Sequence, residues 1–229
     1  MRATLIDSKE LTPDIRHFVF EVPDVEKLDF MPGQFASLTQ TINGKEITRA
    51  YSFASAPGEG NRFELCLNLV PDGLFSAQLF DMKPGDAVAM RPPLGTFTLR
   101  KPARDSIFVA TGTGIAPFRS MLQAHLSDTS PSFTLLFGSR YEQGLVYKEE
   151  FDEMAGRYPH FHFWPILTRP EQGWKGRRGR VQGHVREAVG DRRDLDIYLC
   201  GLQEMVNETR AMLKEMGFDR KQILYEKYD

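Results

Sequence analysis

The strongest constraint on the fold is a change in residue pattern close to Lys101 and Pro102. Before this point, short runs rich in β-branched and aromatic residues are separated by turn dipeptides such as Pro32-Gly33 and Asn43-Gly44. After it, apolar runs alternate with segments of helical period. The first pattern predicts an antiparallel β-barrel, and the second a doubly wound parallel α/β sheet. We therefore expect two domains, residues 1–102 and 103–229.

The spacing of apolar residues along the sequence predicts where the strands and helices lie. In the first domain, strands are expected at 15–22, 34–39, 50–53, 63–70 and 87–90, with one short helix at 74–80. In the second, strands are expected at 106–110, 133–137, 161–167, 196–200 and 222–226, and helices at 116–125, 148–157, 182–189 and 203–216. Residues 170–179 are expected to form an exposed loop.

Charge and cysteine content exclude several classes of function. The formal net charge of −2 gives no electrostatic footprint for nucleic acid or for an anionic membrane surface. No stretch approaches the ~20 apolar residues that would span a bilayer. The two cysteines, Cys66 and Cys200, provide no disulfide framework, no metal site and no four-cysteine iron–sulfur cluster. We expect a cytoplasmic protein whose iron–sulfur or other carrier would be a separate molecule.

The run from Arg49 to Ser52 combines a cation, an aromatic ring and a hydroxyl on one extended stretch. Arg49 can pair with phosphate oxygens through a forked, charge-assisted contact, and Tyr51 faces the same side of a strand because side chains alternate. In isolation Tyr51 would be an ordinary strand aromatic and Arg49 a solvated charge. The motifs downstream favour a nucleotide site.

A second motif, Gly73-Leu74-Phe75-Ser76, opens the short predicted helix. Free backbone N–H groups and the helix dipole would point at whatever occupies the turn, and a pyrophosphate fits there. The alternative is a plain glycine turn in which Ser76 acts as a cap.

A third motif, Gly112-Thr113-Gly114 followed by Pro117, comes after the first strand of the second domain and opens a helix. This is the context of a dinucleotide-binding loop, although Pro117 stands where a third glycine would be expected.

Together with Cys200-Gly201, these motifs in this order resemble the ferredoxin–NADP⁺ reductase superfamily, over nearly the whole chain. The run from Arg49 to Ala56, with Thr168-Arg169 and Arg180, is most similar to bacterial ferredoxin or flavodoxin reductases. The resemblance implies FAD on the barrel and a nicotinamide nucleotide on the α/β domain, with no metal.

The resemblance also implies roles for individual residues. It places the Tyr51 ring against the isoalloxazine, the Ser52 hydroxyl near the reactive flavin nitrogen, and Thr113 near the nicotinamide. Cys200 and Gly201 would border the nicotinamide, and Glu226 resembles an acidic residue of the family near its C-terminus. The implied catalytic group is Tyr51, Ser52, Cys200 and Glu226.

Selecting NADPH over NADH requires cations for the extra ribose phosphate. Arg140, Arg169 and Arg180 lie in predicted loops after successive strands, and Tyr147 is a candidate ring for stacking on adenine. The alternative is a set of ordinary solvated loop cations. We expect NADP(H) to be preferred over NAD(H).

The last aromatic residue, Tyr228, is a candidate for stacking on the flavin, as an aromatic residue does in the plant enzymes. Those enzymes end on the aromatic residue, whereas here Asp229 follows, so the position of Tyr228 stays open.

The predicted function is an FAD-dependent NADPH oxidoreductase that exchanges electrons with a separate acidic carrier, a ferredoxin or a flavodoxin. Scattered cations at Arg91, Arg100, Lys101 and Arg104 are candidates for docking it. Two alternatives remain: an NADH-dependent reductase component of an oxygenase system, and a flavin subunit that works only inside a larger complex.

Overall fold

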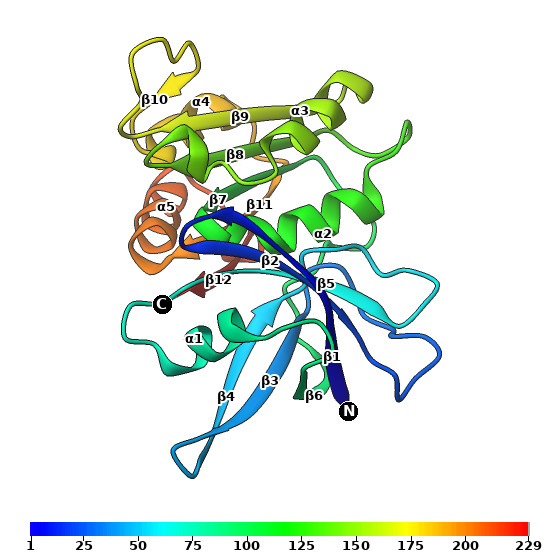
Figure 1. The fold of residues 1–229 in the computed structure, drawn as a ribbon. Coiled ribbons are helices and arrows are strands. Elements are labelled where there is room, and N and C mark those ends of the chain that lie inside the picture. Colours follow the sequence, from blue (N-terminus) through cyan, green and yellow to red (C-terminus); the bar gives the residue numbers. More distant parts are fainter. Residues whose placement is uncertain (229) are drawn as a thin grey trace. The chain divides into compact units, whose positions relative to one another are not determined.

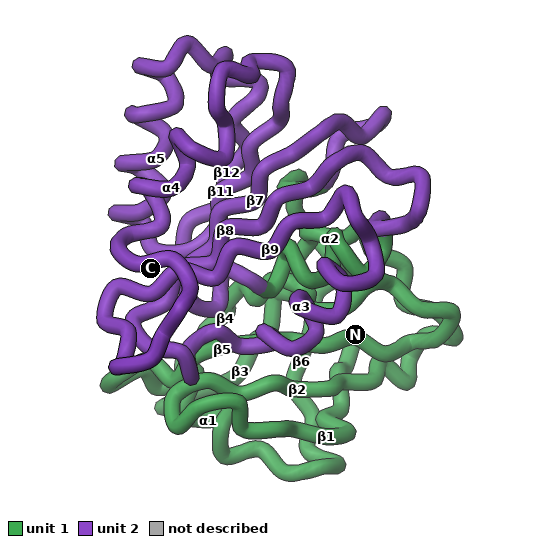
Figure 2. Tube along the Cα trace, turned by 90° about the horizontal axis from the view of Figure 1, so that it is seen from above, with its two compact units in different colours: residues 1–98, 116–124 green, residues 99–115, 125–229 purple. Residues whose placement is uncertain are grey.

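The computed structural model describes residues 1–228, which form two compact units (Figures 1 and 2). Unit 1 comprises residues 1–98 and 116–124, and unit 2 comprises residues 99–115 and the chain from His125 onward. The expected domain boundary at residue 102 stays a prediction. The assignment of residues 116–124 to unit 1 is a feature that the sequence pattern does not suggest.

Unit 1 is built on six antiparallel strands in the order β4-β3-β6-β1-β2-β5. An isolated antiparallel bridge between Phe53 and Leu65 connects the two ends of this order, as the predicted barrel requires. The elements are β1 (Arg2–Thr12), β2 (Ile15–Glu21), β3 (Phe35–Ile42), β4 (Lys45–Ser52), β5 (Arg62–Asn68), α1 (Leu74–Asp81) and β6 (Ala87–Leu94).

Aromatic side chains fill the interior of unit 1. The rings of Phe20 and Phe63 are stacked with centroids 5.4 Å apart, and Phe53 meets Phe63 edge-on at 5.4 Å. All three are essentially inaccessible to solvent. Burial of each such side chain contributes about 1.5–3 kcal/mol, so this cluster stabilises the barrel.

Strand β1 was not among the expected strands. It pairs with β2 along most of its length and with β6 at its start, but its register shifts between Leu5 and Asp7 and again between Glu10 and Thr12. These irregularities break the period-two alternation on which strand prediction depends.

Unit 2 contains a parallel six-stranded sheet in the order β10-β9-β8-β7-β11-β12, which confirms the predicted doubly wound α/β sheet (Figure 1). Its strands are β7 (Ser106–Thr111), β8 (Phe133–Ser139), β9 (Phe161–Leu167), β10 (Arg177–Arg178), β11 (Asp196–Leu202) and β12 (Ile223–Tyr228). The α-helices of the second half of the chain are α2 (Ala116–His125), α3 (Lys148–Arg157), α4 (Val181–Val189) and α5 (Gln203–Glu215).

Helices cover both faces of the parallel sheet. On one face Val109 and Leu136 pack with Val185 of α4 and Val206 of α5 in a single buried cluster. On the other face, Phe151 of α3 packs against Phe163 of β9, with ring centroids 5.4 Å apart. Successive side chains of a strand point to opposite faces of the sheet. Apolar side chains therefore lie on both faces here, as is typical of a parallel sheet that helices cover on both sides.

Two details of unit 2 are not indicated by the sequence pattern. The segment expected to be a simple loop contains β10, in which Arg177 and Arg178 pair with the end of β9. Arg100 and Arg104, candidates for carrier docking, both form ion pairs with the fully buried carboxylate of Asp196, at 3.3 and 3.4 Å. Those two cations therefore stabilise the start of β11.

Candidate functional site

Strand β4 and helix α1 bring the first two motifs together within unit 1. The ring of Tyr51 lies 6.1 Å from the ring of Phe75, with the two planes tilted by 31°. Burial raises the pKa of Tyr51 from 10.0 to about 12, although the charge of Arg49 opposes the shift. Tyr51 is thus a neutral, half-buried ring fixed between two elements. Such a ring can support a flat ligand.

Arg49 lies on the exposed part of β4, on the same side of the strand as Tyr51. One guanidinium nitrogen donates to the carbonyl of Thr48 at 2.9 Å. Since a guanidinium has five N–H donors, others can reach an anion. Ser52 is 5% exposed and ends the strand.

The turn before α1 requires glycine at position 73. A β-carbon there would lie 2.7 Å from the β-carbon of Val70 and 2.9 Å from its carbonyl oxygen. The buried Ser76 hydroxyl accepts from the Val70 N–H at 3.0 Å and donates to the Gly73 carbonyl at 3.1 Å. Its side chain therefore stabilises the turn, and a role of Ser76 in holding a pyrophosphate stays a prediction. The first N–H groups of α1, from Leu74 to Ser76, have no intrahelical acceptor and can receive a phosphate.

In unit 2 the glycine loop and the Cys-Gly pair are in direct contact. The loop Gly112–Ile115 is a 3₁₀ turn that follows β7. A β-carbon on Gly114 would lie 2.6 Å from the carbonyl carbon of Cys200 and 2.7 Å from the α-carbon of Gly201. Both glycines are required by this close approach, since Gly201 has φ of +137° and lies against Thr111.

Thr111 and Thr113 complete this contact. The Thr111 hydroxyl accepts from the N–H of Leu202 at 3.2 Å, which ties the end of β7 to the end of β11. Thr113 is 8% exposed and lies within the loop. The predicted nicotinamide residues Gly112, Thr113 and Gly114 are thus held beside Cys200.

Cys200, Glu226 and Tyr228 lie close to one another at the carboxyl ends of β11 and β12. Cys200 is directly opposite Glu226 in the strand register. Complete burial raises the pKa of the Cys200 thiol well above its ordinary value; the Glu226 charge adds to this, and a hydrogen bond with Tyr228 opposes it. Burial therefore favours the neutral thiol of Cys200 over the thiolate, which argues against a role as a nucleophile.

The arginines proposed for the ribose phosphate are exposed and lie after neighbouring strands. The N–H of Arg169 donates to the carbonyl of Arg140 at 2.9 Å, so the chain segments after β8 and β9 run side by side. Arg180 immediately precedes α4. Tyr147 precedes α3 and has φ of +62°.

Arg180 has acidic partners that the sequence pattern did not indicate. Its guanidinium lies 3.1 Å from Glu204 and 3.5 Å from Glu208, both on α5. An anionic ligand at Arg180 would have to compete with these carboxylates. The residues directly after Arg140 contribute to an open pocket of about 390 Å³. Its lining is Tyr141, Glu142, Gln143 and Glu171.

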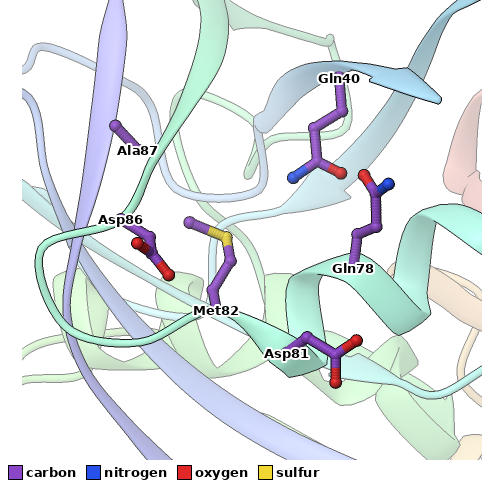
Figure 3. A pocket seen from close by; sticks show the side chains of 6 residues that line it. All are labelled: Gln40, Gln78, Asp81, Met82, Asp86 and Ala87. Atoms are coloured by element: carbon purple, nitrogen blue, oxygen red, sulfur yellow. The ribbon is translucent and has the colours of Figure 1, made fainter. Parts of the chain in front are cut away.

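A second pocket, of about 350 Å³, lies in unit 1 at the other end of α1 (Figure 3). Gln40 of β3, Gln78 of α1 and the chain before β6 contribute to it, and none of the predicted cofactor residues lines it. The full lining is Gln40, Gln78, Asp81, Met82, Asp86 and Ala87. It is distinct from the glycine turn at the start of the same helix.

Comparison with known proteins decides the family. Residues 2–99 match the oxidoreductase FAD-binding domain family, and residues 108–211 match the oxidoreductase NAD-binding domain family. The ferredoxin–NADP reductase B of Sorangium cellulosum is 37% identical over 237 residues, covering 99% of this chain and 97% of that protein. The chain therefore belongs to the ferredoxin–NADP⁺ reductase-like family of FAD- and NAD(P)-binding oxidoreductases. This reductase is a flavoenzyme that transfers electrons from NAD(P)H.

The relatives of the reductase include proteins with different electron-transfer roles. The anthranilate 1,2-dioxygenase electron transfer component of Acinetobacter baylyi is 32% identical over 89% of this chain, which spans 60% of that protein. A solved ferredoxin NADP⁺ reductase from Neisseria gonorrhoeae, with bound FAD and NADP, has a TM-score of 0.86 at 24% identity, covering 99% and 98% of the two chains. The latter likeness confirms the fold.

No helix within residues 1–228 is long and apolar enough to cross a membrane. In the same range there is no group of three or more His, Cys, Asp or Glu side chains arranged to hold a metal ion.

Proposed function

We propose that the protein is an FAD-dependent NADPH oxidoreductase that exchanges electrons with a separate one-electron carrier, a ferredoxin or a flavodoxin. The observation that carries the choice of NADPH is the position of Arg140, Arg169 and Arg180 after the carboxyl ends of β8, β9 and β10. Three exposed guanidinium groups after neighbouring parallel strands suit a phosphate that NADH lacks. The 37% identity to a ferredoxin–NADP reductase over nearly its whole length supports the choice of carrier.

The residues of unit 1 fit FAD. The first backbone N–H groups of α1 have no intrahelical acceptor and can bind a pyrophosphate, and Arg49 adds a cation. Tyr51 would lie against the flavin ring and Ser52 would form a hydrogen bond near its reactive nitrogen. Bound FAD supplies an acceptor of two electrons that can release them singly.

The residues of unit 2 fit a nicotinamide nucleotide. Gly112, Thr113 and Gly114 would hold its pyrophosphate and nicotinamide portion, and Gly201 beside Cys200 lets the end of β11 lie directly against Thr111 at the start of this loop. Cys200 stays protonated and shapes the contact, and Glu226 contributes negative charge beside it. Tyr228 would have to release Cys200 before its ring could stack elsewhere. No side chain needs to transfer a proton in the hydride step, so the protein acts through position and electrostatics.

A second candidate is an NADH-dependent reductase component of an oxygenase system. It is favoured by the ion pairs of Arg180 with Glu204 and Glu208, which compete with a ribose phosphate, and by the dioxygenase components among the relatives.

One experiment separates these candidates. The purified holoprotein is mixed with NADPH or NADH in a stopped-flow instrument, and the rate constants for flavin reduction are compared at a range of concentrations. A higher ratio of rate constant to dissociation constant for NADPH supports the proposal, and a higher ratio for NADH refutes it. Reoxidation by purified ferredoxin, flavodoxin and oxygenase components then identifies the carrier.

A further inference from the structure

Helix α2 follows a motif of unit 2 in the sequence but belongs mostly to unit 1. In sequence it follows the glycine loop Gly112–Ile115 without a break. In the structure, its residues 116–124 belong to the compact unit of the barrel. Phe118 of α2 packs on Phe97 of this unit, with ring centroids 5.9 Å apart, and a set of partly buried polar contacts adds to this packing.

Arg119 makes two of these polar contacts. Its guanidinium donates to the carbonyl of Ala54 at 2.7 Å and to the carboxylate of Glu64 at 2.6 Å. The Arg119 side chain is 12% exposed and that of Glu64 is 30% exposed. His17 lies 3.7 Å from the same carboxylate oxygen of Glu64. A charge-assisted pair that is this shielded is stronger and more directional than a surface ion pair.

Two more residues of α2 extend the contact along the same segment. The hydroxyl of the fully buried Ser120 donates to the carbonyl of Ser55 at 2.6 Å. The side-chain oxygen of Gln123 accepts from the N–H of Ala56 at 2.9 Å. Three consecutive residues, Ala54 to Ala56, are therefore each bonded to α2.

This segment continues directly from the Arg49–Ser52 motif. Only Phe53 separates Ser52 from Ala54, and the Phe53 N–H is itself bonded to Gln34. Arg119 lies only five positions after Gly114 in the chain. From residue 116 onward this stretch is part of helix α2. A displacement of α2 on residues 54–56 would thus carry the glycine loop with it.

We propose that Arg119 and Ser120 are positioning residues for hydride transfer, because they fix α2 on the segment that follows Ser52 and so determine where the glycine loop lies. The reaction moves one hydride, with its two electrons, from the reduced nicotinamide to the flavin; the nicotinamide is oxidised as the flavin is reduced. Neither Arg119 nor Ser120 gains or loses a proton. Their effect is geometric, and a misplacement of ~1 Å can slow such a step by about 100-fold.

The test compares Arg119→Ala, Arg119→Lys and Ser120→Ala with a control, Arg192→Ala. Arg192 also forms ion pairs, but its partners, Asp105 and Asp194, lie outside α2. Each holoprotein is examined by stopped-flow flavin reduction and by nucleotide titration. Hydrogen–deuterium exchange of residues 112–124 provides a readout that is independent of turnover.

We expect Arg119→Ala to lower the rate constant of flavin reduction about 10- to 100-fold, with the nucleotide dissociation constant changed less than about twofold. Exchange in α2 should accelerate. Arg119→Lys should recover part of the rate because an ammonium can replace one of the two hydrogen bonds. Ser120→Ala should have a smaller effect in the same direction, and Arg192→Ala none.

Flavin reduction at the wild-type rate in Arg119→Ala would overturn the proposal, and so would an equal loss of rate in Arg192→Ala. If Arg119→Ala does not fold, Glu64→Gln is the deciding variant, since it keeps the volume and an acceptor and removes only the charge. Slower reduction in Glu64→Gln would support the proposal, and wild-type reduction would overturn it. This inference requires the flavoenzyme activity but not the preference for NADPH. A wild-type protein that binds no flavin would refute the proposed function itself.

Discussion

Gly114 lies so close to Cys200 that a β-carbon on it would be 2.6 Å from the Cys200 carbonyl carbon. The backbone of β11 cannot retreat, because it is hydrogen-bonded to β7 on one side and to β12 on the other. We therefore predict that Gly114→Ala destabilises the protein by about 1–3 kcal/mol, the usual consequence of overpacking. The variant should also bind the nicotinamide nucleotide more weakly. Urea unfolding and nucleotide titration would measure the two effects.

The matched control is Gly156→Ala on α3, where a β-carbon would meet no atom within 4 Å. Alanine has a higher helix propensity than glycine, so this control should be neutral or stabilising by up to ~1 kcal/mol. Equal unfolding midpoints for Gly114→Ala and the wild type would contradict the predicted contact.

Arg49→Ala should weaken FAD retention. If a charged hydrogen bond to the pyrophosphate is lost, the binding free energy should fall by roughly 1.5–3 kcal/mol. Flavin fluorescence after dilution measures the release, and the bound flavin should be FAD and not FMN. Undiminished retention would show that the backbone of α1 holds the pyrophosphate without Arg49.

The double variant Arg169→Ala, Arg180→Ala should raise the Michaelis constant for NADPH far more than that for NADH. The maximal rate should change less, since the ribose phosphate is remote from the reacting carbon. Conversely, Glu204→Gln removes one competitor for Arg180 and should lower the NADPH constant about 1.5- to 5-fold, the range of a surface ion pair. Steady-state assays with both nucleotides check these outcomes, and an equal response to NADPH and NADH would argue against a ribose phosphate at Arg180.

Alkaline pH should destabilise the protein partly through Tyr51. Its pKa is raised from 10.0 in the unfolded chain to about 12 in the folded one, so the folded state keeps the phenol protonated to higher pH. This contribution to stability is fully present below about pH 10 and is lost as pH rises through about 12. Tyr51→Phe should therefore lose less unfolding free energy than the wild type between about pH 9 and pH 11. Parallel losses in urea titrations of the two proteins would contradict the shift.

Cys200 should act by position. Cys200→Ser keeps nearly the same volume and should slow flavin reduction modestly, whereas Cys200→Leu should slow it severely, because side chains at that contact set the approach of the nicotinamide. The raised thiol pKa also predicts slow alkylation of the native protein by iodoacetamide at neutral pH. Complete loss of flavin reduction in the serine variant, with both nucleotides bound, would reveal thiol chemistry.

Elements with strong periodicity could be predicted from the sequence, and irregular ones could not. Helix α2 and strand β8 lie within a residue or two of their expected bounds because their apolar residues recur at a regular period. Strand β1 is polar and bulged, and β10 pairs only Arg177 and Arg178, so neither gives a periodic signal.

The candidate site shows the same limit. The three glycine-containing motifs could be located because glycine is required where backbones approach closely, as at Gly73 and Gly114. The partners of charged side chains could not be predicted. Glu204 lies 24 positions from Arg180, and Glu64 lies 55 positions from Arg119, so only the folded chain brings each pair together.

The place of α2 has a consequence for synthesis on the ribosome. The last barrel strand, β6, ends at Leu94, but the compact unit that contains the barrel is complete only at Ala124. A nascent chain that has released β6 still lacks the donors that Arg119 and Ser120 bring to residues 54 and 55. Domains generally fold as units as the chain emerges. The barrel should therefore reach its final stability only after the glycine loop and α2 have left the exit tunnel.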